Sequence, residues 1–334
     1  MENRVPVIDI APWFSGDTVA RDAVARDVGA ACEKWGFLIV AGHGIDAALI
    51  EAARTVTRSF FDLPVEEKLL CDSTGRSGGR GYYRVASKSH ARTRGDAKAP
   101  GDLRETFFAG MEAIPGDPYT STVDANRHFA PNVWPSQPHD MRKIWEQYFA
   151  ACNAVARDLL HICAKALNLP ENWFDDKIDR PISTLTAQHN PKLDRPPEPG
   201  QVRSGAHTDF GTLTLLLTED RPGGLQVMGT DGIWYDVKPV PGAFIVNLGD
   251  MMAQWTNDRW RSTLHRVVNP PLDAGEAARR LSIVYFHTPN YDTVIECIPS
   301  CTDPAHPAKY APIEAGKHLA EKLQKTDGVS RKAS

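Results

Sequence analysis

Residues 205–216 read GAHTDFGTLTLL, and this stretch combines a His-x-Asp pair with residues that alternate with a period of two. Side chains two apart on a β-strand point to the same face of the sheet, so this alternation predicts a strand. After about residue 182 the same period recurs in short segments separated by Gly, Pro, Asn and Asp: 183–190, 212–219, 225–239, 243–252, 264–270 and 279–290. Many short strands at this spacing predict an antiparallel jelly roll.

Helical periodicity precedes these strands. Apolar side chains recur every three or four positions between residues 140 and 168, and Pro170 follows the end of this pattern. Similar patterns predict helices over 18–34 and 46–61. The polar stretch 73–101 is rich in Gly and Arg but lacks the Walker spacing, so we expect a mobile surface loop or lid there. The chain is thus predicted to be an α+β, mainly β protein with helices around a β core.

Composition excludes several classes of protein. The chain has 334 residues, of which 42% are hydrophobic and 24% are charged, and this is typical of a globular protein. A formal net charge of −4 gives no electrostatic reason to expect binding to nucleic acid or to an anionic membrane. The first ten residues lack both the basic and the apolar part of a signal peptide, and no long apolar run follows. We therefore expect neither a nucleic acid nor a membrane as a partner.

Six cysteines are spread along the chain. Cys297 and Cys301 are four apart and could form a disulfide or half of a metal site. No second Cys or His pair with zinc spacing follows them in the sequence, so free thiols are the simpler interpretation. Cysteines that stay as free thiols predict a cytoplasmic protein, because thiols remain reduced in the cytosol.

Three side chains can form a metal site. His207 and Asp209 are two apart at the start of a predicted strand, so both point to one face and can reach one divalent ion. His265, in the separate segment WRSTLHRVV at 260–268, offers a third ligand. Two histidines and one carboxylate on one face of an octahedron leave three positions open, as in non-haem Fe(II) sites. A hydrolytic zinc site uses the same donor types and stays open as an alternative.

A second pair suggests how an anion would be held. Arg280 and Ser282 are again two apart on one predicted strand, in RRLSIVYF at 279–286. An arginine that points into a sandwich needs an anion, because burial of an unpaired charge is costly. A guanidinium fork beside a hydroxyl suits the distal carboxylate of a dicarboxylic cosubstrate. The alternative is that Arg279 or Arg280 pairs with a surface carboxylate.

The chain resembles the isopenicillin N synthase-like family of Fe(II)- and 2-oxoglutarate-dependent oxygenases over almost its whole length. VPVIDI, EKWGFLIVAGHGI and FFDLPVEEK resemble the helical N-terminal region of that family. GAHTDFGTLTLL, GGLQV, FIVNLGDMMAQWTNDRWRSTLHRVVNP and RRLSIVYF resemble its catalytic core in the same order. The resemblance implies a distorted double-stranded β-helix, which is a cupin-like jelly roll, framed by helices.

Four regions are expected from this resemblance. Residues 1–110 would form a mixed α/β N-terminal region, and residues 111–180 a helical linker with a long helix. Residues 181–300 would form the catalytic jelly roll with the Fe(II) and 2-oxoglutarate sites. Residues 301–334 would form a C-terminal helix and tail.

The resemblance also implies the cofactors and their ligands. His207, Asp209 and His265 would bind Fe(II), and Arg280 and Ser282 would hold the C5 carboxylate of 2-oxoglutarate. The family consumes O2 and 2-oxoglutarate, releases succinate and CO2, and removes hydrogen from a substrate. Hydroxylation, desaturation and ring closure are the possible outcomes.

Asn190 stands where many relatives have a tyrosine that helps to hold 2-oxoglutarate, just before Pro191. The Asn190 amide could bind a carboxylate but reaches less far than tyrosine. An ordinary turn asparagine is the alternative.

Strand parity also suggests residues that contact substrate. Phe286 shares a face with Arg280, Gln188 shares one with Asn190, and Leu225 shares one with Val227. Arg80 and Tyr82 in the basic, aromatic loop could cover the site and hold a substrate carboxylate. A loop that is simply solvated is the alternative. The tentative substrate residues are therefore Phe286, Gln188, Arg80, Tyr82 and Leu225.

The leading functional interpretation is an oxygenase that acts on a small molecule in bacterial natural-product metabolism, such as antibiotic biosynthesis. An oxidase of the isopenicillin N synthase type is the alternative, in which the Arg-x-Ser pair holds the substrate and 2-oxoglutarate is not consumed. A zinc hydrolase and a non-catalytic jelly roll are further alternatives. The sequence leaves the substrate and the oligomeric state open.

Overall fold

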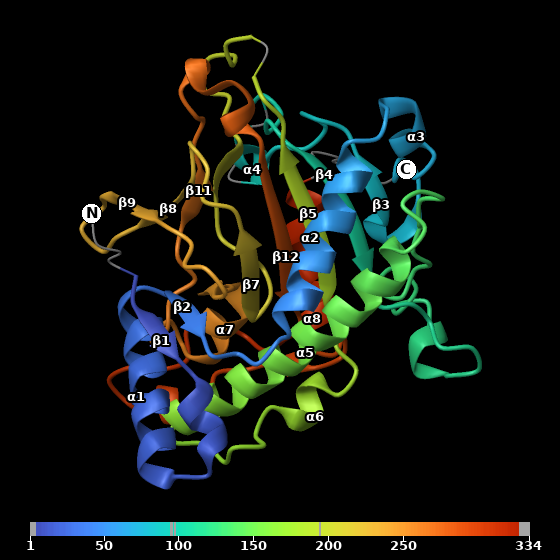
Figure 1. Ribbon diagram of the computed structural model, residues 1–334. Helices are drawn as coiled ribbons and strands as arrows, with labels where there is room; N and C mark the ends of the chain where they lie inside the picture. The colour runs from blue at the N-terminus through green and yellow to red at the C-terminus, as the bar shows by residue number, and fades with distance from the viewer. Residues whose placement is uncertain (1–4, 94–95, 97, 194, 327–334) are drawn as a thin grey trace.

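Two β-sheets form the centre of the molecule (Figure 1), in which the structure describes residues 5–93, 96, 98–193 and 195–326. This computed structural model contains the strands β1 Val7–Asp9, β2 Phe37–Ala41, β3 Gly81–Tyr83, β4 Glu105–Gly110, β5 Thr184–Asn190, β6 Ser204–His207, β7 Leu213–Thr218, β8 Leu225–Met228, β9 Trp234–Val237, β10 Phe244–Leu248, β11 His265–Val267, β12 Arg280–His287, β13 Val294–Ile295 and β14 Ile313–Glu314. The larger sheet has eight strands in the order β1-β2-β10-β7-β12-β5-β4-β3, and the smaller has four in the order β6-β11-β8-β9. Among the described strand pairs of these two sheets, only β1 and β2 run parallel. The predicted antiparallel jelly roll is confirmed.

Apolar side chains from both sheets pack against each other between them. This cluster joins Phe37 and Ile39 of β2 and Ile245 of β10 to Leu225 and Val227 of β8. Each such side chain contributes roughly 1.5–3 kcal/mol when it is fully buried. Residues that alternate with this packed set point to the outer faces of the sheets, as strand geometry requires.

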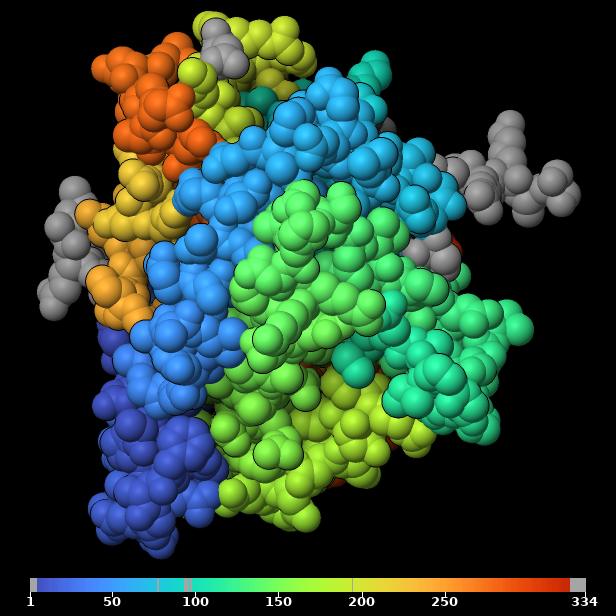
Figure 2. All heavy atoms as spheres, turned by 45° about the vertical axis from the view of Figure 1, so that its right-hand side comes forward, coloured from blue at the N-terminus to red at the C-terminus, as the bar shows by residue number. Residues whose placement is uncertain are grey.

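Helices cover the outer face of the larger sheet. The helices on this face are α1 Thr18–Lys34, α2 Ala47–Phe61 and α5 Met141–Ala166. The other helices are α3 Val65–Leu69, α4 His90–Thr93, α6 Asp175–Ile178, α7 Asp250–Trp255 and α8 Ala315–Thr326, of which α4 packs on β6 of the smaller sheet. Figure 2 shows this side, where blue atoms of the N-terminal helices and green atoms of α5 form the surface. Leu281, Ile283 and Tyr285 of β12 belong to the same apolar core as the buried stripe of α5. The Tyr285 hydroxyl donates to the Asn153 side chain of α5 at 2.7 Å.

The sequence pattern located the long helices well because their ends carry local signals. The Asp17 and Asp46 side chains accept hydrogen bonds from Val19 N–H and Ala48 N–H, and so cap α1 and α2. Asn168 adopts a left-handed φ of 57° just after α5, and Pro170 prevents the helix from continuing.

Two expectations about secondary structure are corrected. The stretch 73–101, expected to be a mobile loop or lid, contains β3, which pairs with β4 at the edge of the larger sheet. Residues 94, 95 and 97 of that stretch lie outside the described residues. The end of the predicted strand 243–252 is helical from Asp250 onward.

In the part of the chain that the structure describes, no helix combines the length and the apolar character needed to cross a bilayer.

Candidate active site

His207, Asp209 and His265 come together at one end of the smaller sheet. His207 ends β6, His265 begins β11, and the two residues lie directly opposite each other in the antiparallel ladder. Oδ1 of Asp209 lies 3.7 Å from Nε2 of each histidine. Ligand atoms of all three side chains lie within 4.8 Å of one another. The sequence therefore identified three groups that do converge and could hold a metal ion.

Main-chain carbonyls orient both imidazole rings. Nδ1 of His207 lies 2.7 Å from the Gly205 carbonyl oxygen, and Nδ1 of His265 lies 3.0 Å from the Thr263 carbonyl oxygen. A carbonyl only accepts hydrogen bonds, so each Nδ1 carries the proton and donates. Each Nε2 then presents its lone pair to the space near Asp209, as a metal ligand must. Burial lowers the pKa of His207, and the neighbouring His90 and His265 lower it further.

The second oxygen of Asp209 is held by two donors. Thr214 Oγ1 of β7 and Asn247 Nδ2 of β10 donate to Oδ2 at 2.6 and 2.7 Å. These contacts fix the carboxylate so that Oδ1 faces the two imidazoles. Two neutral imidazole nitrogens and one carboxylate oxygen are donors that fit Fe(II).

Arg280 is a buried cation with open donors. It begins β12, and only 4% of its surface is exposed. Among the described residues, none forms a hydrogen bond or ion pair with its guanidinium. The guanidinium nitrogens are also absent from the fully buried polar atoms that lack a partner, so they have some accessible surface. Burial lowers the pKa of Arg280 to about 10, and nearby Arg203 adds to the effect. The guanidinium group therefore has donors available for an anion.

The residues beside Arg280 form a polar row. Ser282, two residues along β12, exchanges a hydrogen bond of 2.8 Å with Thr218 of β7. Asn190 of β5 pairs directly with Arg280 in the sheet. However, the Asn190 amide already donates to the Leu103 carbonyl at 2.9 Å. One of its two N–H groups is thus used within the protein.

Arg80 and Tyr82 do not have the environment expected of substrate residues. The Arg80 guanidinium is buried and donates to the main-chain carbonyls of His128 and Met111 at 2.7 and 3.3 Å. The Tyr82 hydroxyl donates to Glu105 at 2.5 Å, and its ring packs among apolar residues under the helices. Both side chains are therefore part of the internal structure. The expectation failed because β3 was not recognised as a strand.

Of the remaining substrate candidates, Gln188 and Phe286 lie on the larger sheet and face the smaller one. Gln188 pairs with Ser282, and Phe286 pairs with Thr184 and Thr214, so both share the face of Arg280. Both side chains are half-buried, so solvent reaches this face. Leu225 is buried in the apolar cluster between the sheets.

The sequence analysis missed a polar group beside His207. The His90 ring of α4 stacks on the His207 ring with centroids 3.8 Å apart. Arg104 Nη2 lies 2.9 and 3.2 Å from the two ring nitrogens of His90, and His90 Nδ1 lies 3.0 Å from Asp102. A Cβ atom on Gly205 would lie 2.9 Å from the Ala91 nitrogen, so this glycine lets β6 approach α4 closely. No periodic pattern signals such a contact, because it depends on how distant segments pack.

Comparisons with known proteins agree with this geometry. A family model described as non-haem dioxygenase in morphine synthesis N-terminal matches residues 5–137, and one described as 2OG-Fe(II) oxygenase superfamily matches residues 182–289. The chain is 34% identical to the 2-oxoglutarate-Fe(II) type oxidoreductase hxnY of Emericella nidulans, over 92% of this chain and 86% of that protein. It is 32% identical to validamycin A dioxygenase of Streptomyces hygroscopicus subsp. limoneus, over 96% and 86% of the two chains. Among solved structures, a full-length Neurospora crassa protein in complex with alpha-KG matches with a TM-score of 0.82 and 30% identity, over 96% of this chain and 95% of that one.

Proposed function

Because the chain belongs to the 2OG-Fe(II) oxygenase superfamily, we propose that His207, Asp209 and His265 bind its Fe(II) and that Arg280 and Ser282 bind its 2-oxoglutarate. The enzyme uses Fe(II), 2-oxoglutarate and O2, as this family does. These residues and Asn190 all lie within 181–300, the range predicted as the catalytic core.

Bound Fe(II) and 2-oxoglutarate supply an oxidant from O2 while 2-oxoglutarate becomes succinate and CO2. The protein's own residues prepare the site. The Gly205 and Thr263 carbonyls fix the two imidazoles, and Thr214 and Asn247 fix the Asp209 carboxylate. Such supporting contacts hold ligands in a binding geometry before the metal arrives.

The observation that carries the cosubstrate assignment is the open guanidinium of Arg280. An unpaired buried charge is costly, so its persistence indicates a ligand of opposite charge. A carboxylate can accept two hydrogen bonds from the fork, and the Ser282 hydroxyl on the same face can add another. An oxidase that does not consume 2-oxoglutarate is not favoured, because the relatives reported above are named for 2-oxoglutarate or as dioxygenases.

The substrate is proposed to be a small molecule of natural-product metabolism. Support comes from the validamycin A dioxygenase of Streptomyces and from the 2-oxoglutarate-dependent dioxygenase citB of Monascus ruber, which is 34% identical over 86% of this chain. Hydroxylation is the favoured outcome, since homoarginine-6-hydroxylase of Oryza sativa is also 32% identical over 96% of this chain.

The test is a screen of small molecules with protein that has been loaded with Fe(II) and 2-oxoglutarate without O2. Addition of O2 should produce succinate in proportion to oxidised substrate, and the His265→Ala protein should produce none. Substrate oxidation without succinate would indicate the oxidase, and conversion without O2 would indicate a hydrolase.

A further inference from the structure

Arg104 lies on the same face of the larger sheet as Arg280. It immediately precedes β4, where Glu105 pairs with His189, and the Asn190 amide donates to the carbonyl of Leu103. Continuing this register places Arg104 opposite Asn190, which in turn pairs with Arg280. Two arginines therefore flank Asn190 across three strands.

The Arg104 guanidinium is only partly used by the protein. Its side chain is 10% exposed, and Nη2 contacts His90. Within the described part of the chain, Nε and Nη1 have no hydrogen-bond partner. Both atoms have some solvent-accessible surface, because neither is among the fully buried polar atoms that lack a hydrogen bond. Nε and Nη1 lie on different edges of the planar guanidinium, so each can donate one charge-assisted hydrogen bond to a carboxylate oxygen.

The Asp102 carboxylate does not form a hydrogen bond with the Arg104 guanidinium. The shortest approach of its carboxylate to Arg104 is 3.5 Å, which is long for a hydrogen bond. Asp102 instead accepts from the main-chain N–H groups of Gly205 and His90, at 3.1 and 3.2 Å. Its oxygens thus hold β6 and α4 together.

Aromatic rings and a second cation lie on the same side. Tyr83 of β3 pairs with Thr106 of β4, and its ring meets that of Phe108 edge-on at 5.4 Å. The Lys88 ammonium lies 3.8 Å from the Tyr83 ring centre and 5.3 Å from that of Phe108. No acidic side chain among the described residues pairs with Lys88. Arg104 and Lys88 thus place two positive charges on this side of the sheet, and Asp102 and Asp209 are the carboxylates whose charges act on Arg104.

We propose that Arg104 determines substrate specificity by binding a carboxylate of the substrate, with Tyr83 and Phe108 contacting a flat ring attached to it. This inference rests on the proposed function, which assigns the 2-oxoglutarate carboxylates to Arg280 and the metal. Because Arg104 contacts His90, which stacks on His207, the substrate would be held beside the metal ligands.

The test measures binding and turnover with matched acids and amides. The probes are benzoate, phenylacetate, cinnamate and indole-3-carboxylate, each beside its primary amide. Calorimetry would use protein loaded with Mn(II) and N-oxalylglycine, an inert mimic of 2-oxoglutarate. The wild type should bind at least one acid more tightly than its amide. Arg104→Gln should weaken that binding by about thirty- to hundred-fold, since a charge-assisted hydrogen bond is lost.

Two further variants make the result specific. Arg104→Lys keeps the charge without the fork and should recover part of the affinity. Arg26→Gln removes an exposed arginine of α1 and should leave acid binding unchanged. Arg104→Gln should also keep the wild-type affinity for 2-oxoglutarate, which calorimetry with Fe(II) protein measures without O2.

Three results would overturn the inference. The wild type could bind no acid more tightly than its amide, Arg104→Gln could retain acid binding, or Arg104→Gln could lose 2-oxoglutarate instead. A protein that binds neither Fe(II) nor 2-oxoglutarate would contradict the proposed function itself. The two failures are therefore distinguishable.

Discussion

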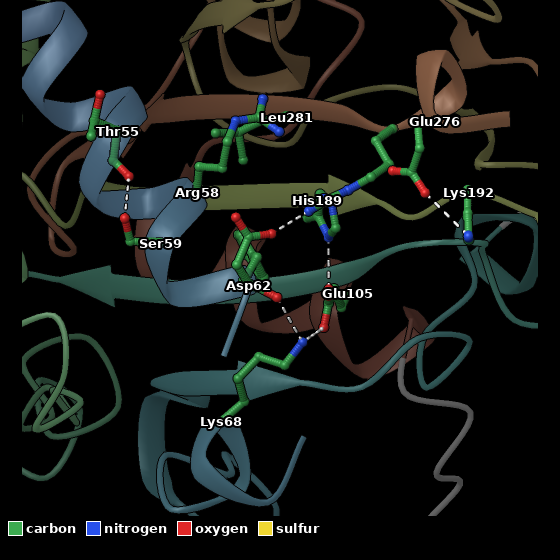
Figure 3. A network of polar contacts seen from close by, with 12 residues as sticks. Thr55, Arg58, Ser59, Asp62, Lys68, Glu105, His189, Lys192, Glu276 and Leu281 are labelled. Atoms are coloured by element: carbon green, nitrogen blue, oxygen red, sulfur yellow. Dashed lines mark hydrogen bonds and ion pairs between the residues drawn. The ribbon is translucent and has the colours of Figure 1, made fainter. Parts of the chain in front are cut away.

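The two faces of β4, β5 and β12 differ in whether their buried charged side chains have partners within the protein. On the face toward the helices, Glu105 accepts from Lys68 at 2.9 Å and from His189 at 2.7 Å (Figure 3). The Tyr82 hydroxyl adds a third contact to Glu105. On the face toward the smaller sheet, Arg280 has no partner among the described residues. Neighbouring residues on the same strands thus belong to two different electrostatic environments.

This difference distinguishes charged side chains that stabilise the fold from those that we propose bind ligands. The charges under the helices are compensated by other side chains, so they hold α2 and α3 against the sheet. We propose that ligands compensate the Arg280 charge, which faces the smaller sheet. Arg203 shows that burial alone does not make a binding site, because this guanidinium donates to the carbonyls of Pro222, Gly223 and Ala278.

Glu105→Ala should have the largest effect on stability. It would leave the Lys68 ammonium, which is 5% exposed, without its carboxylate, and would also deprive Tyr82 and His189 of their acceptor. Breaking such a buried pair costs about 3–5 kcal/mol, which urea unfolding would measure. Glu66→Ala, at an exposed position of α3, should change the unfolding free energy by less than about 0.5 kcal/mol. Equal effects of the two substitutions would contradict the internal role of Glu105.

Arg280→Gln should give the opposite result. Because this guanidinium has no internal partner, its loss should not lower the unfolding free energy, and removal of an uncompensated buried charge should leave it equal or raise it. Binding of 2-oxoglutarate should weaken by about 2–3 kcal/mol, or roughly thirty- to hundred-fold, in an anaerobic titration. A large loss of stability with unchanged 2-oxoglutarate affinity would remove the contrast between the two faces.

Thr214→Val should weaken metal binding by a smaller factor. Valine is similar in shape to threonine but cannot donate to Oδ2 of Asp209, which would keep only the Asn247 contact. Loss of such a supporting contact typically lowers metal affinity by about 10- to 100-fold, and titration with Fe(II) measures it. Thr186→Val is the matched control, because the Thr186 hydroxyl is buried without a partner. Similar metal affinities of both variants would show that Thr214 does not support the ligand.

Acid should reduce the contribution of Glu105. Burial alone would raise the pKa of Glu105, but hydrogen bonds from His189, Lys68 and Tyr82 outweigh burial and lower the pKa below 4.5. A carboxylate with a lowered pKa stabilises the fold above its unfolded pKa and loses that contribution as the pH falls through the folded pKa. The difference in unfolding free energy between wild type and Glu105→Gln should therefore be constant near neutral pH and shrink below about pH 4.5. Urea titrations at several pH values measure this, and a difference that does not change with pH would disprove it.

Sequence reasoning succeeded where alternation fixed the direction of a side chain. Parity placed Gln188 and Phe286 on the face of Arg280, and the His-x-Asp pair with His265 pointed to the observed cluster. It failed for Tyr82, because β3 has three residues in a polar stretch without alternation. Tyr83, one position later, lies on the face toward the site, since a shift of one residue reverses direction.

Other features depend on contacts between distant segments. His90 stacks on His207 only because Gly205 admits α4 beside β6. Arg104 gains its position from the pairing of β4 with β5. Neither contact leaves a local pattern in the sequence. The roles of the individual site residues remain predictions that the experiments above address.

Anaerobic calorimetry with Fe(II) measures whether His207, Asp209 and His265 form one ferrous site. Metal-free wild-type protein should bind one Fe(II) ion per chain, 2-oxoglutarate should bind more tightly afterwards, and His265→Ala should lose this Fe(II) binding. Unchanged Fe(II) affinity in a folded His265→Ala protein would show that His265 is not a ligand of the metal.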